Sequence, residues 1–276
     1  MRWLGYALLA LLALAAAYIL LLAVAALAVD PGREYPSESR FYRRLLDGAV
    51  RVCLCVSRVK LRTEGLETLP EGPFLLVSNH RSNYDPIVTW SALKSHRVAF
   101  VSKQANFRIP IFGRLIRKCG CMAIDRENPR KALACVKNAA ALLERGENCV
   151  GIYPEGTRSK QCVLLEFHNS VFKIAQMAHA PIVVMTVEGT EKIHKNAPWR
   201  QTEVTLRTAA VIPAEELEGK RTAEIGARVR EAMRQTVVGM MPLILAFNLI
   251  KGVLNAVITF VVYKRISGFL HQEVLH

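Results

Sequence analysis

Acidic residues are scarce in this chain of 276 residues. Asp and Glu number 23 against 37 Lys and Arg, which gives a formal net charge of +14. An excess of basic charge suits nucleic acid, anionic lipid or a phosphorylated substrate. The sequence has no zinc-finger spacing, no helix-turn-helix signal and no interleaving of aromatic with basic residues, so we exclude nucleic acid as a partner. Anionic lipid and phosphorylated substrates remain.

Several catalytic motifs are also missing. There is no G-x-S-x-G elbow, no P-loop and no H-E-x-x-H sequence, which argues against a serine-elbow hydrolase, a nucleotide hydrolase and a zinc protease. The cysteines number seven, an odd count, and none forms a C-x-x-C pair. We therefore interpret them as reduced cysteines in a cytosolic compartment rather than as disulfides or zinc ligands.

Charge is absent from Trp3 to Val29, a run of 27 residues. As a helix this run is about 40 Å long, enough to span a bilayer with some tilt. A signal peptide is the alternative, but its apolar core is normally shorter. We expect residues 1–30 to be a retained transmembrane anchor. Basic residues follow this segment and only Arg2 precedes it, so the next domain should lie on the cytoplasmic face of the membrane.

Residues 31–62 are expected to form a basic amphipathic helix at the membrane surface. Between 38 and 60, one helical face carries apolar side chains, including Tyr42, Leu45, Val52 and Val56, and the opposite face carries arginines. The alternative is a helix packed on the core of the domain.

An apolar stretch near the other end is ambiguous. Within 237–263 a narrow polar stripe of Asn248, Lys251, Asn255 and Thr259 lies on an otherwise apolar helix. We predict that 237–276 is a membrane-associated helix and tail. A second span is the minority interpretation, because it would carry Lys264 and Arg265 to the outer side.

Between these ends, residues 63–236 alternate short β-branched runs with helical patterns. We predict an α/β domain with a mostly parallel sheet flanked by helices. The expected strands are 73–79, 97–102, 149–154, 181–189 and 203–212. The expected helices are 85–95, 106–118, 128–146, 168–179 and 214–238.

Polar clusters follow several of these strands, where an open α/β sheet binds its ligands. In "SNHRSNYDP", His80 precedes Asp85 by five residues. A histidine can take a proton from a hydroxyl, and a carboxylate on its other ring nitrogen would fix the tautomer. Taken alone, Asp85 is equally well explained as the N-cap of a helix.

Three cations lie near other strand ends. Arg158 follows Gly156 in "YPEGTRS", Arg126 lies in "AIDREN", and Lys103 follows the second strand. Arginine suits phosphate because its fork can bond two oxygens. Surface cations paired with neighbouring carboxylates are the alternative. Together with a His–Asp pair, these cations indicate activation of a hydroxyl on a phosphorylated substrate, without a covalent enzyme intermediate.

Four segments in order resemble the motifs of the glycerolipid acyltransferases, a family that includes the 1-acylglycerol-3-phosphate acyltransferases. "NHRSNYD" resembles their N-H-x-x-x-x-D motif, and "YPEGTRS" matches their third block. "IPIFGRLIRKCGCMAIDRE" and "APIVVMTVEGT" resemble the second and fourth blocks. The resemblance covers about residues 65–215.

The resemblance implies transfer of a fatty acyl group from acyl-CoA or acyl carrier protein to the sn-2 hydroxyl of lysophosphatidic acid, with no metal or cofactor required. The partners would be a lysophospholipid acceptor, the acyl thioester donor and membrane lipids. His80 would be the general base and Asp85 its orienting partner. The predicted substrate-binding residues are Lys103, Arg126, Glu155, Gly156, Thr157 and Arg158. Another lysophospholipid or an aminolipid as acceptor, or a catalytically dead lipid-binding protein, are the alternatives.

One segment departs from the family. After the third block the family often has phenylalanine followed by Lys-Lys-Gly or Lys-Pro-Gly, whereas this chain has "EFHNSVFKIAQ", with His168 and Asn169 there. The change leaves the proposed base untouched. We expect His168 and Asn169 to alter how the acceptor head group or the thioester donor is bound.

Overall fold

The computed structural model describes residues 2–35, 37–159, 161, 163–238, 249–260 and 262–263. The chain divides into two compact units, residues 1–233 and 234–276. The helices are α1 Arg2–Leu27, α2 Arg40–Val56, α3 Asp85–Ala92, α4 Phe112–Arg117, α5 Pro129–Glu144, α6 Lys173–Met177, α7 Ile193–Asn196 and α8 Thr222–Val238. The strands are β1 Val59–Glu64, β2 Leu75–Ser78, β3 Ala99–Lys103, β4 Met122–Ile124, β5 Val150–Ile152, β6 Ile182–Glu188 and β7 Thr202–Ile212.

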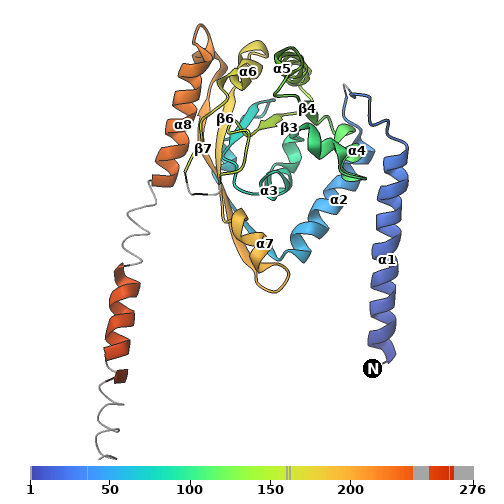
Figure 1. Cartoon of the computed structure of the whole chain (residues 1–276), viewed down its shortest axis with the longest axis vertical. Coiled ribbons are helices and arrows are strands. Elements are labelled where there is room, and N and C mark those ends of the chain that lie inside the picture. The colour runs from blue at the N-terminus through green and yellow to red at the C-terminus, as the bar shows by residue number, and fades with distance from the viewer. Residues whose placement is uncertain are drawn as a thin grey trace, which may run out of the picture. The chain divides into compact units, whose positions relative to one another are not determined.

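One sheet of seven strands organises the first unit, in the order β1-β7-β6-β2-β5-β3-β4 (Figure 1). Strands β6, β2, β5, β3 and β4 run parallel to one another. The carboxyl ends of these five strands therefore meet at one edge, which we call the catalytic edge. The predicted α/β domain with a mostly parallel sheet flanked by helices is confirmed.

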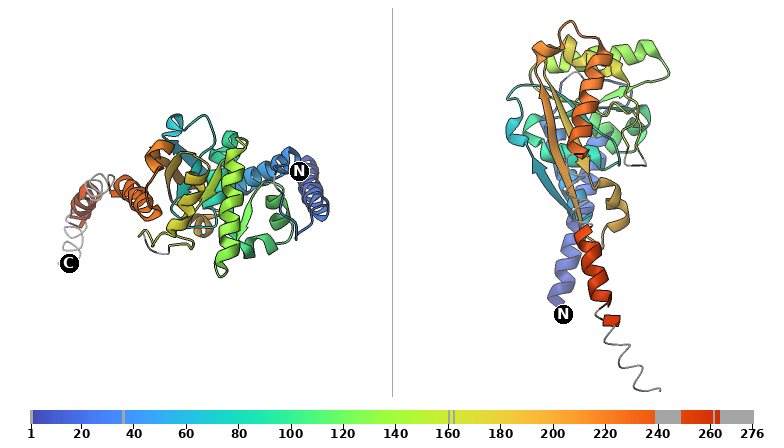
Figure 2. Two further views of the ribbon diagram at one scale, coloured as in Figure 1. Left: turned by 90° about the horizontal axis from the view of Figure 1, so that it is seen from above. Right: turned by 90° about the vertical axis from the view of Figure 1, so that its left-hand side faces the viewer.

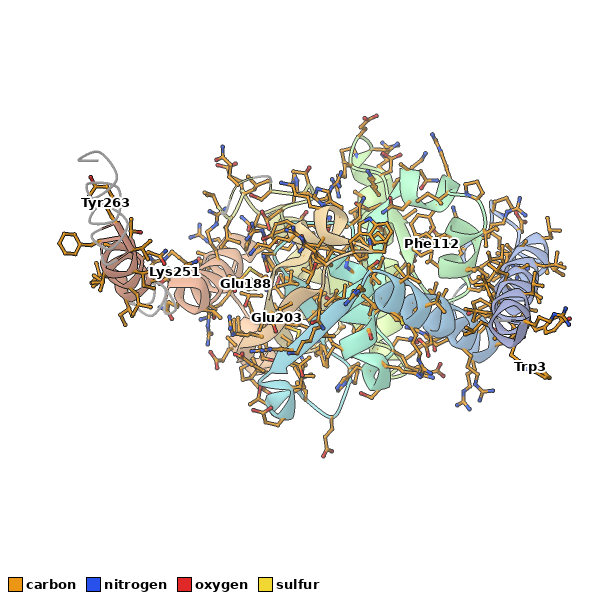
Figure 3. All side chains as sticks on the ribbon, turned by 90° about the horizontal axis from the view of Figure 1, so that it is seen from below. Trp3, Phe112, Glu188, Glu203, Lys251 and Tyr263 are labelled. Atoms are coloured by element: carbon orange, nitrogen blue, oxygen red, sulfur yellow. The ribbon has the colours of Figure 1, made fainter. Side chains whose placement is uncertain are left out.

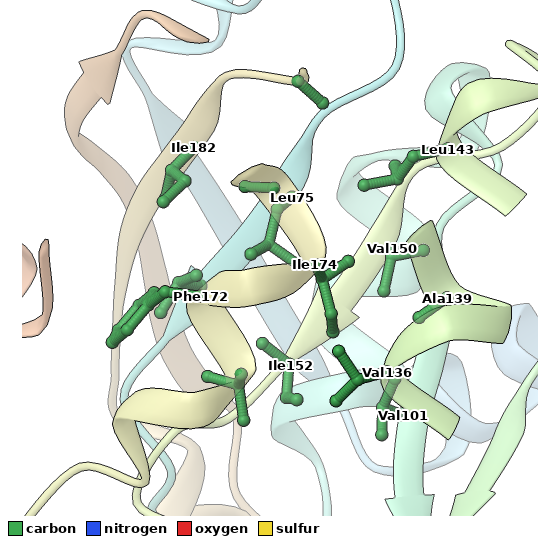
Figure 4. Packing of buried hydrophobic residues seen from close by; sticks show 14 of the residues in the cluster. Leu75, Val101, Val136, Ala139, Leu143, Val150, Ile152, Phe172, Ile174 and Ile182 are labelled. Atoms are coloured by element: carbon green, nitrogen blue, oxygen red, sulfur yellow. The ribbon is translucent and has the colours of Figure 1, made fainter. Parts of the chain in front are cut away.

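Helices cover both faces of the sheet because the buried strands are apolar on both sides. Leu75 and Val77 of β2 belong to one core cluster. Leu76 and Phe74, the residue just before β2, belong to the other. The first cluster includes side chains of α5, α6 and α8. Figure 4 shows those of α5 and α6 together with Phe172, and Figure 2 shows α8 alongside the sheet. The second includes side chains of α2, α3 and α4. The result is a three-layer α/β/α unit.

Two strands escaped the sequence prediction. β1 lies where the helix predicted for 38–60 was expected to end, and β4 has only three residues. β1 is a largely exposed edge strand, so its side chains do not give the apolar run of a buried strand. The sheet is mostly parallel, as predicted, with one antiparallel pairing between β6 and β7, while β7 pairs parallel with β1.

Three predicted helices are shorter than expected, each with a 3-10 turn at its start. The helix predicted for 106–118 is α4 after the 3-10 segment Gln104–Arg108, and the one for 168–179 is α6 after Asn169–Phe172. The helix predicted for 214–238 is the segment Ala214–Leu217 followed by α8.

Helix α2 packs on the domain. Leu46, Val50 and Leu54 lie in the core cluster of the second face. Val52 and Val56, predicted for the apolar face, are 54% and 62% exposed. The alternative interpretation, a helix packed on the core of the domain, describes these contacts. The predicted location of α2 at a membrane surface stays a prediction.

Helix α1 is long and apolar enough to cross a membrane, by length and composition. Its last turns pack on the domain, where Ala25 and Ala26 are buried against Leu45 and Leu115. Tyr18 donates a hydrogen bond to the carbonyl of Leu45 at 2.6 Å. The rest of α1 is largely exposed, and Figure 3 shows Trp3 pointing away from the domain.

The apolar segment near the other end is described in part. Leu249–Phe260 is a helix with exposed side chains. Asn248, Lys264 and Arg265, on which the predicted topology of 237–276 depends, lie outside the described residues.

Candidate active site

His80 and Asp85 lie against each other just beyond the end of β2. His80 Nδ1 is 2.8 Å from Asp85 Oδ2. The carboxylate is fully buried, and the histidine side chain is 19% exposed. This contact leaves Nε2 as the ring nitrogen that faces away from the carboxylate, in the arrangement of a base with an orienting partner.

Asp85 does not cap helix α3. The helix begins at Asp85, its N-cap residue is Tyr84, and no side-chain capping bond is present. Asp85 Oδ2 instead accepts hydrogen bonds from the main-chain N–H of Arg81 and Ser82, at 2.6 and 2.8 Å. The carboxylate therefore closes the turn between β2 and α3 while it holds His80.

Thr190 completes the shell around Asp85. Its hydroxyl donates a hydrogen bond to Asp85 Oδ1, and the residue is fully buried. Sequence reasoning missed Thr190, although it lies in the fourth segment that resembles the acyltransferase family. Its position just after β6, the parallel neighbour of β2, was the available signal.

Asn79 joins the same two strands where the ladder between them ends. Its side-chain amide donates to the carbonyl of Val187 at 3.0 Å, and its side-chain oxygen accepts from the N–H of Val187 at 2.8 Å. This side chain takes the place of a main-chain rung. It fixes the residue directly before His80.

Aromatic stacking holds the imidazole from the side of β5. The rings of His80 and Tyr153 are stacked with centroids 4.4 Å apart, and Phe100 stacks on Tyr153 in turn. Burial, followed by the negative charge of Asp85, raises the pKa of Tyr153 well above its ordinary value. Tyr153 therefore stays a neutral phenol beside the histidine.

Glu155 lies behind the histidine and not in the open site. It is 3% exposed. Its two oxygens accept hydrogen bonds from the main-chain N–H groups of His80, at 2.8 Å, and Leu165, at 2.9 Å. Burial is the main cause that raises the pKa of Glu155, and these two hydrogen bonds act against it. Both carboxylate oxygens of Glu155 thus contact the main chain, and its predicted contact with substrate stays a prediction.

The remaining predicted residues lie at the same edge of the sheet. Gly156 has φ +67 in the turn after β5, a conformation that favours glycine. Thr157 and Arg158 follow it and are exposed, and Lys103 is exposed at the end of β3. Arg126, beyond β4, donates a hydrogen bond to the carbonyl of Gly156.

His168 is a neighbour of Gly156 that the sequence did not assign to the site. A Cβ placed on Gly156 would lie 2.9 Å from Cδ2 of His168 and 3.1 Å from Nη1 of Arg126. The residue that departs from the family pattern thus lies beside the turn that carries Arg158. Two side chains able to donate to an anion converge on one glycine.

The described cysteines form no disulfide with one another. Burial is the main cause that raises the pKa of Cys121 and of Cys149 to about 11. Such buried, protonated thiols are poor nucleophiles. No group of three or more His, Cys, Asp or Glu side chains is placed to hold a metal within the part of the chain that the structure describes.

Comparisons with known proteins agree with the motifs. Residues 60–188 match the family model described as Acyltransferase. The chain is 38% identical over 136 residues to a chloroplastic 1-acyl-sn-glycerol-3-phosphate acyltransferase of Arabidopsis thaliana, covering 49% of this chain and 37% of that protein. It is 29% identical over 167 residues to the 1-acyl-sn-glycerol-3-phosphate acyltransferase of Escherichia coli, covering 60% and 67%. The chain thus spans less than two thirds of the Arabidopsis relative.

A solved structure has a similar fold. The 1-acyl-sn-glycerophosphate (LPA) acyltransferase PlsC from Thermotoga maritima superimposes with a TM-score of 0.56 at 21% identity. The similarity covers 72% of this chain and 81% of that one. At 21% identity, this structural similarity supports a shared fold and nothing more specific.

Proposed function

We propose that the protein acylates the sn-2 hydroxyl of lysophosphatidic acid, giving phosphatidic acid. The match of residues 60–188 to the family model described as Acyltransferase supports this proposal. The observation that carries the proposal is the 2.8 Å contact between His80 Nδ1 and Asp85 Oδ2 at the catalytic edge. The relatives named above are acyltransferases of this acceptor, which makes it the first candidate.

In the proposed reaction His80 is the general base. Asp85 holds the proton on Nδ1, so Nε2 accepts the proton of the acceptor hydroxyl as its oxygen attacks the thioester carbonyl carbon. The buried carboxylate stabilises the imidazolium that forms. The carbon–sulfur bond then breaks, and the imidazolium returns its proton to the departing thiolate. The products are the new ester and a free thiol, and His80 is neutral again.

The exposed cations at the catalytic edge are proposed to hold the phosphate of the acceptor. Arg126 is fixed on the carbonyl of Gly156, and Arg158 and Lys103 are exposed at the ends of neighbouring strands. Such cations gain more from a dianionic phosphate than from a neutral head group. Glu155 is proposed to position His80 through the main chain.

Helix α1 is proposed to hold the protein in the membrane, with the catalytic domain on the cytoplasmic face. Its exposed apolar surface supports this assignment. The acceptor is a lipid, and a cytoplasmic site has access to acyl-CoA or acyl carrier protein. The donor is decided by assaying both thioesters side by side.

A different lysophospholipid is the second candidate acceptor, and His168 is the observation that favours it. This side chain lies beside Gly156, close to the proposed phosphate cations. An imidazole ring offers a planar N–H donor where the lysine of the family pattern would offer an ammonium group. Such a site would discriminate less strongly for a phosphate monoester.

One assay separates these possibilities. Membranes containing the protein are supplied with one acyl-CoA and a panel of lysophospholipids that differ in head group. We expect lysophosphatidic acid to give the highest kcat/KM and His80→Asn to abolish turnover. His179→Asn, a change at an exposed histidine, is the matched control and should retain activity. Preference for another head group would move the assignment to the second candidate, and turnover by His80→Asn at the wild-type rate would refute the mechanism.

A further inference from the structure

The loop after α7, residues 197–201, exposes a large aromatic side chain and is called the Trp199 loop. Trp199 is 84% exposed, although hydrogen bonds fix the loop around it. The N–H of Arg200 bonds to the carbonyl of Asn196 at 2.7 Å, and the Asn196 amide bonds to Thr202 Oγ1 at 3.0 Å. Ile193 anchors α7 in the core. The structure thus holds a tryptophan out in solvent, where its apolar ring surface gains nothing from the fold.

The charge around Trp199 is positive. Lys192, Lys195 and Arg200 are exposed, and none of the three forms an ion pair with a described residue. The acidic neighbours are already engaged, since Glu191 pairs with Arg81 at 3.5 Å and Glu203 with two cations of β1. A tryptophan flanked by free cations is the side-chain set that is enriched where proteins meet the head groups of a bilayer.

This loop lies at the catalytic edge. The 3-10 segment Thr190–Lys192 leads into α7, and Thr190 bonds to Asp85. On the other side, the N–H of Thr202 bonds to the carbonyl of Arg58 at 3.1 Å, directly after α2. Val52 and Val56 are exposed on that end of α2. Apolar and basic side chains from two segments therefore meet at the edge that carries the proposed base.

Helix α1 extends toward the same edge. Tyr42, near the start of α2, donates to the carbonyl of Ala25 at 3.0 Å, and Tyr18 donates to the carbonyl of Leu45. Earlier residues of α1 thus contact later residues of α2, so the two helices run antiparallel. Since α2 ends beside the Trp199 loop, the exposed apolar part of α1 continues in that direction (Figure 1). A bilayer that holds α1 is therefore next to the catalytic edge.

We propose that residues 197–201, the Trp199 loop, form a second membrane contact, in which Trp199 inserts among the head groups of an anionic bilayer and Lys195 and Arg200 bind lipid phosphates. With α1 as the first contact, the loop fixes the tilt of the domain over the membrane. Together they hold the catalytic edge against the lipid surface. The proposal depends on the exposed side chains around Trp199 and on the direction of α1. It does not depend on which reaction the protein catalyses.

Fluorescence of the full-length protein tests the position of Trp199. The protein is reconstituted in bilayers of phosphatidylglycerol and phosphatidylcholine in equal parts, as the Trp3→Phe variant and as the Trp3→Phe/Trp199→Phe variant. The difference between their emission spectra isolates Trp199 from Trp90. We expect this component to be blue-shifted and to be quenched by lipids brominated in the upper part of the acyl chain.

Two results would overturn the proposal. Quenching of the Trp199 component by aqueous iodide and not by brominated lipid would place the side chain in water. Protection from both quenchers would place it in a protein contact. In detergent-free bilayers, either result would refute insertion whether or not the protein transfers acyl groups.

A charge variant tests the lipid partner. Lys195→Gln/Arg200→Gln is compared with Lys137→Gln/Lys220→Gln, which removes the same charge from exposed lysines on α5 and after β7. We expect the first variant to reduce the quenching of Trp199 by brominated phosphatidylglycerol by about twofold and the control to leave it unchanged. Equal quenching in both variants would refute the role of the two cations.

Discussion

Glu155 controls His80 through the main chain. Glu155 Oε1 accepts the N–H of His80 at 2.8 Å, and Oε2 accepts the N–H of Leu165 at 2.9 Å. A buried carboxylate thus joins the segment just after β2, which carries the proposed base, to the loop that follows "EGTR". Several contacts that hold the site are single side chains that bridge two segments, and each can be removed by one substitution.

Glu155→Gln tests the link. The amide can accept only one of the two N–H groups, so we expect a loss of roughly 1–3 kcal/mol of transition-state stabilisation, measured as a fall in kcat at unchanged KM. Glu166→Gln, an exposed change in the same segment, is the control. An equal fall in activity in both variants would show that Glu155 has no specific effect on His80.

The same variant predicts a pH dependence of stability. Burial raises the pKa of Glu155 above its usual 4.5, so the folded state keeps the proton at pH values where the unfolded chain has lost it. The wild type should therefore lose stability relative to Glu155→Gln as the pH rises from about 4.5 through the raised value. Thermal unfolding of both proteins across this range gives the difference in Tm, and a difference that grows in favour of the wild type has the wrong sign.

Asp85→Asn should abolish most of the activity. The neutral amide cannot stabilise an imidazolium. Its NH2 group must also replace one carboxylate oxygen, either Oδ2, which contacts His80, Arg81 and Ser82, or Oδ1, which accepts from Thr190. In a comparable His–Asp pair such a change lowers kcat by about 10⁴. Single-turnover rates measure the loss, and far-UV circular dichroism checks the fold. A rate within about tenfold of wild type would argue against general-base catalysis by this pair.

Thr190→Val removes the hydrogen bond to Asp85 Oδ1 and conserves shape. A hydrogen bond to a charged group contributes roughly 1.5–3 kcal/mol, so kcat should fall by about tenfold to a hundredfold. Thr190→Ser keeps the hydroxyl and should restore most of the rate. Equal rates in the valine and serine variants would show that the hydroxyl is dispensable.

Gly156→Ala should weaken acceptor binding. The added methyl would lie 2.9 Å from Cδ2 of His168 and 3.1 Å from Nη1 of Arg126, so both side chains must move. Gly146→Ala is the matched control, because its φ is +74 and no heavy atom lies within 4 Å of the new methyl. Both variants lose about 1 kcal/mol from backbone strain, but only Gly156→Ala should raise the KM for the lysophospholipid. A raised KM in both would point to strain alone.

Arg43→Ala should destabilise the fold. Arg43 pairs with the buried Glu38, lies over the ring of Trp90 at 3.8 Å and donates to the carbonyl of Val98 at 3.2 Å. Its loss leaves the buried carboxylate of Glu38 with only the longer ion pair to Arg97, at 3.8 Å. Removing one partner of a buried ion pair costs about 3–5 kcal/mol. Arg228→Ala, which breaks an exposed pair with Glu216, should leave the denaturation midpoint almost unchanged. Denaturant unfolding of both variants gives the comparison.

The fold was predictable where the signal is local. The strands β2, β3, β5, β6 and β7 and the long helix α5 follow from apolar runs, a proline in the first turn and a glycine past the end. β1 was missed because an exposed edge strand lacks such a run, and its partner β7 lies far along the chain. The sequence also did not predict that β7 is antiparallel to β6. Strand direction depends on which strands pair in the sheet, and local sequence patterns do not report that.

The sequence by itself determined the α/β alternation, the apolar character of α1, and the placing of His80, Asp85 and the three cations near strand ends. These properties depend on residues close together in the chain, so spacing and periodicity report them. Only the tertiary structure decided the use of each carboxylate. Asp85 is held by Thr190, 105 positions away, and Glu155 binds the main chain of His80, 75 positions away. Burial and hydrogen-bond geometry between distant segments make one carboxylate the partner of a base and the other its support.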